Sequence, residues 1–304
     1  MTETIKQRLT AIVGEQGLHL DEPMWRHTTF RIGGNADLLI EPTCEEQVSA
    51  AVALLKQEQS PYMILGNGSN VLVGDKGIRG VVIKIGNGFS PCEAEGTTLI
   101  AQSGIKLSRL AKFALEQGLT GLEFAAGIPG TLGGALYMNA GAYGGEMKQV
   151  VKEVTYLTPD GEKKTILGEE CEFGYRTSIF AKMDGCVILS CKLDLGKGDP
   201  KEILALMEDL AERRCSKQPL NLPSAGSTFK RPEGYFAGKL IQDAGLMGFR
   251  VGGASVSEKH AGFVVNDQEA TAKDVRMLIQ EIQKKVQADF GVHLEPEVKF
   301  VGEF

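Results

Sequence analysis

A glycine-rich segment in the middle of the chain constrains its fold more than any other feature. Residues 127–145 read GIPGTLGGALYMNAGAYGG, with seven glycines and large apolar side chains that include Ile128, Leu132, Leu136, Tyr137 and Met138. A disordered linker would not carry so many large apolar residues, because linkers of that kind are polar. The segment therefore predicts buried backbone that packs either against a large, flat, partly apolar ligand or as a glycine-rich corner between helices.

A second glycine pair follows an expected apolar strand, in the stretch LGNGSNVLV at residues 65–73. Glycines accept positive φ and let backbone N–H groups approach an anion, while Ser69 and Asn70 add side-chain donors. The stretch matches neither the Walker loop nor the dinucleotide fingerprint GxGxxG that opens a helix. Taken alone, it predicts either a tight turn or a phosphate site.

Composition limits the function classes that are open to the chain. With 304 residues, 42% of them hydrophobic, the chain is long enough for two domains. A formal net charge of -6 and scattered cations argue against nucleic-acid binding, which needs a basic stripe. The six cysteines form no CxxC pair and the four histidines lie far apart, so we expect reduced thiols and no metal site. Without an apolar signal core or a membrane-length apolar run, the chain is expected to be soluble and cytoplasmic, with no membrane partner.

Periodicity predicts an alternation of helices and strands. Helical spacing covers residues 4–16, 44–59, 106–119, 200–219 and 271–291. Strands are expected at residues 36–42, 62–66, 80–86, 97–104, 186–195, 253–257, 261–266 and 294–302, with a β-hairpin around Asp160–Gly161. Composition and rhythm change after Pro219, which places a boundary near residues 200–220. The front part is α+β and rich in glycine turns, and the smaller back part is α/β.

Seven stretches of the chain together resemble one enzyme family. In chain order they are TTFRIGGNADLLIEP, LGNGSNVLV, AGIPGTLGGALYMNAGAYG, GYRTSIF, SAGSTFKRP, KHAGFVVN and LEPEVKFVG. They resemble, in the family's own order and over nearly the whole chain, the UDP-N-acetylenolpyruvoylglucosamine reductases, known as MurB. Seven matches in order are far more specific than any one of them.

The resemblance implies a fold and an activity. The fold would be α+β, a vanillyl-alcohol-oxidase-type (PCMH-type) FAD-binding domain at residues 1–205, made of two subdomains split near 85, and a smaller α/β substrate-binding domain at 206–304. The reaction would be the reduction of UDP-N-acetyl-enolpyruvoylglucosamine to UDP-N-acetylmuramate for peptidoglycan, with FAD as carrier and NADPH as reductant. No obligate protein partner is implied. The run from Gly234 to Asn266 leaves no room for the insertion with a tyrosine loop found in one form of the family, so the chain resembles the shorter, type II form.

The resemblance also assigns cofactor contacts. The Gly66–Asn70 loop and the Gly130–Gly134 turn would cradle the FAD diphosphate through backbone N–H groups, and the segment from Asn139 to Gly141 would run beside the flavin. The expected FAD-binding residues are Gly66, Asn67, Gly68, Ser69, Asn70, Ile128, Gly130, Gly133, Gly134, Asn139 and Gly141.

The chemistry of the reaction fits three further residues that the resemblance marks as catalytic. Hydride goes to one alkene carbon, so negative charge develops next to a carboxylate and calls for a cation, a donor and a proton. Arg176 would hold the carboxylate in two hydrogen bonds. Glu297 would stabilise the enolate as a protonated donor with a raised pKa. Ser227 would deliver the proton, although by itself its sequence predicts only a Ser-Thr turn.

Some assignments stay open at this point. Glu295 is the nearest rival of Glu297, because residues i and i+2 share one face of a strand. The resemblance gives Tyr175, Lys217 and Arg231 to substrate binding, with Lys230, His260 and Asn266 as further candidates. The alternatives for function are another oxidoreductase on the same flavin fold and a non-catalytic nucleotide-binding module.

Overall fold

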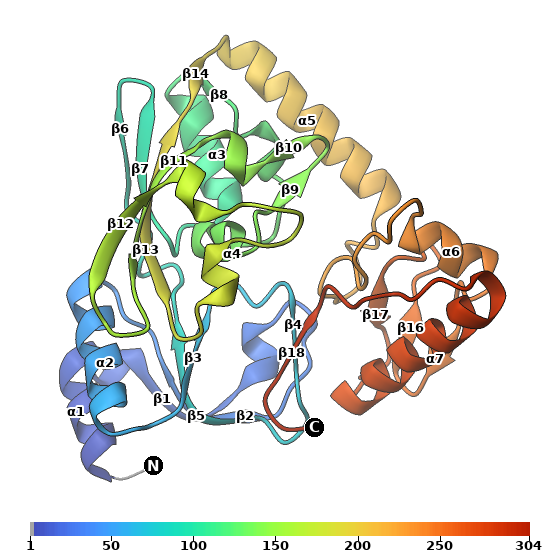
Figure 1. Ribbon diagram of the computed structural model, residues 1–304, viewed down its shortest axis with the longest axis horizontal. Coiled ribbons are helices and arrows are strands. Elements are labelled where there is room, and N and C mark those ends of the chain that lie inside the picture. Colours follow the sequence, from blue (N-terminus) through green and yellow to red (C-terminus); the bar gives the residue numbers. More distant parts are fainter. Residues whose placement is uncertain (1–2) are drawn as a thin grey trace. The chain divides into compact units, whose positions relative to one another are not determined.

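The computed structural model describes residues 3–304 and divides them into two compact units, whose elements are labelled in Figure 1. Unit 1 comprises the chain up to Leu20, then Leu38–Asn67 and Gly80–Arg214. Unit 2 comprises Asp21–Asp37, Gly68–Arg79 and Cys215–Phe304. Each unit is therefore assembled from segments far apart in sequence, whereas the division predicted between residues 205 and 206 uses contiguous stretches and stays a prediction.

Two helices and a mixed sheet share a core made of residues of unit 1, although the ends of three strands of the sheet fall within the ranges of unit 2. The sheet has the order β1 (Leu18–Pro23), β2 (Asn35–Ile40), β5 (Ile78–Lys84) and β3 (Tyr62–Leu65), and β3 runs parallel to β5. Helices α1 (Glu3–Val13) and α2 (Glu45–Gln57) lie side by side in Figure 1. Ile5, Leu9 and Val13 of α1 recur every four residues and are buried, which is why this face of the helix enters the core.

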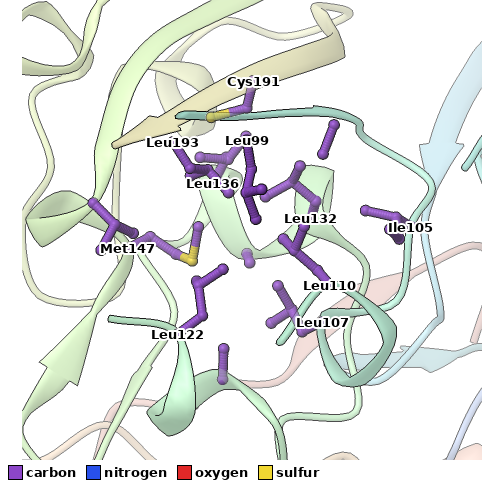
Figure 2. Packing of buried hydrophobic residues seen from close by; sticks show 14 of the residues in the cluster. Leu99, Ile105, Leu107, Leu110, Leu122, Leu132, Leu136, Met147, Cys191 and Leu193 are labelled. Carbon is purple, nitrogen blue, oxygen red and sulfur yellow. The ribbon is translucent and has the colours of Figure 1, made fainter. Parts of the chain in front are cut away.

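The second part of unit 1 is built on an antiparallel sheet. Its order is β12 (Lys163–Leu167), β11 (Val151–Leu157), β13 (Val187–Asp194), β7 (Thr98–Gln102) and β6 (Cys92–Glu95). Helices α3 (Leu107–Glu116) and α4 (Leu132–Tyr137) share its core, and Figure 2 shows Leu99, Leu132, Leu136 and Leu193 gathered in that interior. The glycine-rich segment thus includes a short helix whose large apolar residues are core residues.

Short elements complete unit 1. They are the strand pairs β8 (Leu119–Thr120) with β14 (Gly196–Lys197) and β9 (Gly141–Ala142) with β10 (Gly145–Glu146). The long helix α5 (Pro200–Lys217) follows β14. Across the chain, single 3-10 turns cover Glu15–Gly17, Met24–His27, Glu123–Ala125, Met147–Gln149, Gly168–Cys171 and Ile179–Lys182.

Unit 2 packs two helices against a small antiparallel sheet. The strands are β15 (Arg250–Val251), β16 (Ala254–Val256) and β17 (Val264–Asn266), and the helices are α6 (Ala237–Asp243) and α7 (Ala272–Phe290). A separate parallel pair joins β4 (Val71–Val73) to β18 (Lys299–Val301). At the start of α7, Thr271 and Asp274 form a reciprocal capping box, and the carboxylate of Asp75 accepts from the N–H groups of Ala272 and Lys273.

The sequence predictions agree with most long elements and fail at particular places. The five predicted helices form within a few residues of their expected ends, and the hairpin turns at Asp160–Gly161, where Gly161 has φ +85°. Helices α4 and α6 were not predicted. The predicted strand 294–302 is wrong over residues 294–298, since only Lys299–Val301 forms a strand and Pro296, which has no N–H, makes an isolated bridge with Phe229.

Residues 3–304 contain neither a helix suited to span a membrane nor a side-chain cluster suited to hold a metal ion. Every helix in this range is too short or too polar to cross a lipid bilayer. Within the same residues, histidine, cysteine, aspartate and glutamate side chains do not gather in threes in a way that could hold a metal ion.

Truncating a core leucine tests the packing of unit 1. Leu136 is 0% exposed, so Leu136→Ala should lower the free energy of unfolding by about 2–5 kcal/mol, through lost burial and a residual cavity. Leu204→Ala on α5 is the matched control, because Leu204 is 45% exposed and its loss should change stability by at most about 0.5 kcal/mol. Urea unfolding measures both, and equal effects would contradict the assigned core.

Candidate active site

The first half of the Gly66–Asn70 loop lies against the glycine-rich segment of unit 1. A Cβ at Gly66 would collide with the hydroxyl of Thr131, so a larger residue there requires the Thr131 side chain to move. Asn67 donates from Nδ2 to the carbonyl of Pro129 at 2.6 Å. The two glycine-rich stretches that the sequence singles out are therefore in contact within this unit.

The second half of the loop lies in unit 2 and contacts two other stretches of that unit, residues 27–29 and 297–299. Gly68 has φ +62°, and a Cβ there would collide with the carbonyl oxygen of His27. The carbonyl of Gly68 accepts from the N–H of Thr29 at 3.1 Å. Asn70 donates from Nδ2 to the carbonyl of Glu297 at 3.2 Å and accepts from the N–H of Lys299 at 3.0 Å. The loop is thus fixed by its side chains and by its close backbone approaches.

The two glycine-rich loops have the chemistry that a diphosphate requires. Neither GNGSN at 66–70 nor GTLGG at 130–134 contains a charged side chain, and both offer N–H and hydroxyl donors. Some amides are already used, however: Leu132 donates to Ile105 and Gly133 to Ser103, both at 2.8 Å. Only the other amides of the turn therefore stay as expected donors to the diphosphate. Gly133 instead allows a close approach to Ser103.

Arg176 stands on a two-residue hairpin turn in unit 1. Gly174 and Thr177 exchange hydrogen bonds at 3.1 and 3.4 Å, which leaves Tyr175 and Arg176 at the apex. Arg176 has φ +55°, a left-handed conformation that a bulky residue rarely adopts. Its guanidinium donates to the carbonyl of Gly141 at 3.4 Å and lies 5.4 Å from the Tyr175 ring centroid.

Two of the other FAD-binding residues expected in unit 1, Asn139 and Gly141, contact this turn. Ile128 is half-buried and packs on the main core, and Gly141 starts β9. Asn139 is 1% exposed, with φ +45°, and its side chain makes three hydrogen bonds inside the protein. Its amide group is thus committed to the protein itself.

The loop that carries Ser227 is held at the residue beside it. Thr228 is buried, donates its N–H to Gly262 at 2.9 Å, and accepts the N–H of Val264 on its hydroxyl at 2.9 Å. Thr29 reaches the same loop from the front of the chain, with its hydroxyl 2.7 Å from the carbonyl of Ser224. Ser227 itself is exposed, so its hydroxyl is presented on a rigid frame.

The structure separates the two candidate glutamates. Glu297 is 8% exposed, and its N–H donates to the carbonyl of Thr228 at 2.8 Å, next to Ser227. Glu295 is exposed and its carboxylate pairs with Lys230 at 2.5 Å. The two carboxyl groups differ because this stretch is irregular rather than a strand, so the alternation rule does not apply to it.

The remaining candidates lie in different settings. Tyr175 is 56% exposed, Lys217 is the exposed last residue of α5, and Arg231 lies 4.0 Å over the ring of Phe236. Asn266 donates to the carbonyl of Phe30 and accepts from Ala270, so it ties loops together. The sequence singled out neither Phe236, which is 62% exposed and lies under Arg231, nor Glu146, which accepts a hydrogen bond from Asn139. The only local signal for Glu146 is its place in a capping box.

Burial shifts the pKa values of one histidine and of several cysteines. Burial lowers the pKa of His260, whose Nδ1 accepts from the N–H of Gly262 at 3.0 Å. Burial raises the pKa of Cys92 to about 11 and that of Cys171 to about 12, so neither is a thiolate at neutral pH. All six cysteines, which fall within residues 3–304, are free thiols.

Known proteins resemble the chain over its whole length. A family model described as UDP-N-acetylenolpyruvoylglucosamine reductase, C-terminal domain, matches residues 218–301, and an FAD binding domain model matches residues 36–166. UDP-N-acetylenolpyruvoylglucosamine reductases from Alkaliphilus oremlandii and Clostridioides difficile are 57% and 55% identical, each over 97% of both chains.

Solved structures give the same result for the fold. The UDP-N-acetylenolpyruvylglucosamine reductase of Thermus caldophilus is 34% identical and superposes with a TM-score of 0.80, over 93% of this chain and 98% of the other. Alkyldihydroxyacetonephosphate synthase is similar in fold alone, at 18% identity and a TM-score of 0.50 over 65% of this chain. The α+β architecture with an FAD-binding domain and a distinct C-terminal domain is thereby confirmed.

Replacing Gly68 by alanine tests the loop. The added Cβ would strike the backbone of His27 at a left-handed φ, so Gly68→Ala should displace the loop and lower the FAD content of the purified protein several-fold. Gly96→Ala is the matched control, since Gly96 has φ +64° with open space around it and the change should cost only the left-handed strain, roughly 1–2 kcal/mol. The ratio of flavin absorbance to protein absorbance measures the FAD content of each purified variant. Full FAD content in Gly68→Ala would contradict the assignment of the Gly66–Asn70 loop to FAD binding.

Proposed function

The chain belongs to the UDP-N-acetylenolpyruvoylglucosamine reductase family, and we propose that Arg176, Ser227 and Glu297 carry its reaction. The enzyme reduces UDP-N-acetyl-enolpyruvoylglucosamine to UDP-N-acetylmuramate in peptidoglycan precursor synthesis, with FAD and NADPH. The observation that carries this function is 57% identity over 97% of both chains with a reductase of that name. The roles of the individual residues are supported by their motifs and by the geometry of each unit.

The cofactor residues fit FAD by their chemistry. When bound, FAD supplies the hydride chemistry between NADPH and the alkene. Gly66, Asn67, Gly68, Ser69 and Asn70 would hold its diphosphate together with the turn at Gly130 and Gly134, because these loops offer donors and no negative charge. Ile128 would supply apolar contact, while Gly133 and the backbone at Asn139 and Gly141 would shape the wall.

Arg176 would hold the carboxylate of the enolpyruvyl group. A guanidinium offers a planar fork of donors that matches a carboxylate, and its charge stabilises the negative charge that develops when the alkene is reduced. The hairpin turn that carries Arg176 is bonded at both ends, so the side chain starts from a fixed backbone. This favours positioning of the carboxylate before the reaction.

Glu297 and Ser227 would handle the proton and the enolate. Glu297 would act as a protonated hydrogen-bond donor to the enolate oxygen, and its 8% exposure keeps the carboxyl group away from bulk water. Ser227 is exposed on a loop whose next residue is bonded to Glu297, and it would give its proton to the carbanion-like carbon. A serine is acidic enough for this only because that carbon is strongly basic.

The sugar nucleotide would be held by Tyr175, Lys217 and Arg231, all of which have polar groups at or near the surface. Lys230 is engaged by Glu295, so it is a weaker candidate. Since α6 begins three residues after Gly234, the chain fits the shorter, type II form without a tyrosine loop. We place the enzyme in the cytoplasm, which its free thiols support.

Removing the Ser227 hydroxyl tests the proton donor. Ser227→Ala should leave anaerobic reduction of the flavin by NADPH nearly unchanged and slow its reoxidation by the enolpyruvyl sugar nucleotide by about 10²–10⁴-fold, the usual contribution of a general acid. Ser227→Cys is the matched control, since a thiol of similar size can still donate a proton and should recover part of the rate. Equal losses in both half-reactions would refute the role, and a wild-type enzyme that this substrate cannot reoxidise would refute the proposed function.

The two glutamates can be separated by the same kinetics. Glu297→Ala should slow reoxidation by roughly 10²-fold or more, because a donor to the developing oxyanion is lost. Glu295→Ala should change it by less than about threefold, since an exposed ion pair with Lys230 contributes little. Glu297→Gln keeps a neutral donor and should fall between wild type and Glu297→Ala. A larger effect at Glu295 would reverse the assignment.

A further inference from the structure

The turn that carries Arg176 is anchored by a buried asparagine. We propose that Asn139 is a positioning residue for the reduction, which holds the Gly174–Thr177 turn, and with it Arg176, in place. The proposal rests on the proposed function, because it assigns Asn139 an effect on the step in which Arg176 holds the substrate carboxylate. The expectation that the segment at Asn139 runs beside the flavin then concerns its backbone and not its side chain.

The side chain of Asn139 is fully engaged within unit 1. It is 1% exposed and lies just after α4, at the start of the segment that contains β9 and β10 (Figure 1). Nδ2 donates to the carbonyl of Gly174 at 3.1 Å and to Oε2 of Glu146 at 2.8 Å, while Oδ1 accepts the N–H of Lys148 at 2.9 Å. Both amide hydrogens are thereby used, so the side chain has no donor left for a ligand.

The hydrogen bond from Asn139 to Gly174 is made at the base of the turn, where Gly174 pairs with Thr177. The carbonyl of Gly174 also accepts the N–H of Thr177, so its two lone pairs bind the closing bond of the turn and the Asn139 amide. Arg176 follows two residues later with φ +55°. A residue in this left-handed conformation keeps it only when the surroundings fix the backbone, and the bond from Asn139 supplies part of that restraint.

Two neighbouring contacts place the turn in the same register. Tyr137 accepts the hydroxyl of Ser178 at 2.7 Å, and the carbonyl of Gly141 accepts the guanidinium of Arg176 at 3.4 Å. Three hydrogen bonds therefore join the two segments: residue 137 to 178, residue 139 to 174 and residue 141 to 176. Asn139 is the central contact of the three and the only one whose side chain bonds the backbone of the turn.

Glu146 is the second anchor behind Asn139. Its Oε2 accepts from Asn139, its Oε1 pairs with Lys148 at 2.6 Å, and its backbone N–H donates to Gln149. The amide of Asn139 is thus oriented from both sides. Asparagine also suits the site because it tolerates the φ of +45° found there, as glycine does.

The test uses Asn139→Gly, which removes the three bonds without straining the left-handed backbone. The enzyme with its FAD should retain full flavin content and a wild-type rate of flavin reduction by NADPH. Reoxidation by the enolpyruvyl sugar nucleotide should slow about 10–100-fold, because a displacement of roughly 1 Å in a positioning group costs on that order. The loss should appear when substrate is limiting and also at saturation.

Glu172→Gly is the matched control. Glu172 also has a left-handed φ, +48°, and lies two residues before the turn, but its exposed carboxylate pairs with Lys182 rather than with the turn. Both half-reactions of this variant should stay within about twofold of wild type, since exposed ion pairs contribute little.

A double-mutant cycle with Arg176→Ala separates positioning from general structure. If Asn139 acts through Arg176, the double variant Asn139→Gly/Arg176→Ala should reoxidise no more slowly than Arg176→Ala alone. Losses that multiply in the double variant would overturn the proposal. So would an unchanged reoxidation rate in Asn139→Gly, or loss of FAD with equal damage to both half-reactions, which would return Asn139 to the flavin.

The remaining outcomes are also assigned. If Asn139→Gly does not fold, Glu146→Ala takes its place, because it removes one of the two hydrogen bonds made by Nδ2 of Asn139. This variant should slow reoxidation of the flavin about 3–10-fold and leave reduction of the flavin unchanged. An unchanged reoxidation rate would overturn the proposal. Failure of the wild-type enzyme to be reoxidised would instead count against the proposed function. The two failures are therefore distinguishable.

Discussion

Close approaches at Gly66 and Gly68 hold the Gly66–Asn70 loop against a threonine hydroxyl in unit 1 and against the backbone in unit 2. Within unit 1, Gly66 leaves room for the hydroxyl of Thr131, and within unit 2, Gly68 leaves room for the carbonyl of His27. A side chain at Gly68 would push the loop away from the backbone of His27, and one at Gly66 would force the side chain of Thr131 to move. Each glycine thus restrains the loop within its own unit, Gly66 in unit 1 and Gly68 in unit 2. The donors that suit a diphosphate are available only while this backbone holds its place.

Asparagine side chains then convert close packing into fixed geometry. Asn67 bonds the carbonyl of Pro129, Asn70 that of Glu297, and Asn139 that of Gly174. In each case an amide on one loop bonds the backbone of a second loop, and in two of the three that second loop carries a candidate catalytic residue. Loops otherwise move more than the elements they connect, so such bonds give a loop-built site the rigidity that catalysis requires. The residue type that marks these motifs in the sequence therefore serves the protein's own backbone as much as it serves a ligand.

The sequence predicts the regular elements well and the side-chain partners poorly, for physical reasons. Period-3.6 burial at Ile5, Leu9 and Val13 is a local pattern, so α1 can be read directly. The short helix α4 cannot, because its glycines hide the pattern and its apolar residues enter a core formed by distant strands. The choice between Glu295 and Glu297 depends on an irregular stretch and on Lys230, more than sixty residues away, which no local rule reaches. The role of Asn139 is likewise set by Gly174, across a gap of 35 residues.

The three proposed catalytic residues lie outside the part of the chain that matches the FAD binding domain model. The FAD binding domain model ends at residue 166, and the C-terminal model begins at residue 218, so Arg176 lies outside both. Ser227 and Glu297 lie within the C-terminal model. A fold that is also found in alkyldihydroxyacetonephosphate synthase, at 18% identity, cannot by itself determine which reaction follows. Reduction of an enolpyruvyl ether needs a cation for the carboxylate and a proton for the neighbouring carbon, and under the proposed assignment these come from a hairpin turn and a C-terminal loop outside the FAD-model range. Changes in those two loops, with the glycine cradle kept, are therefore the expected route by which one flavin scaffold serves different reactions.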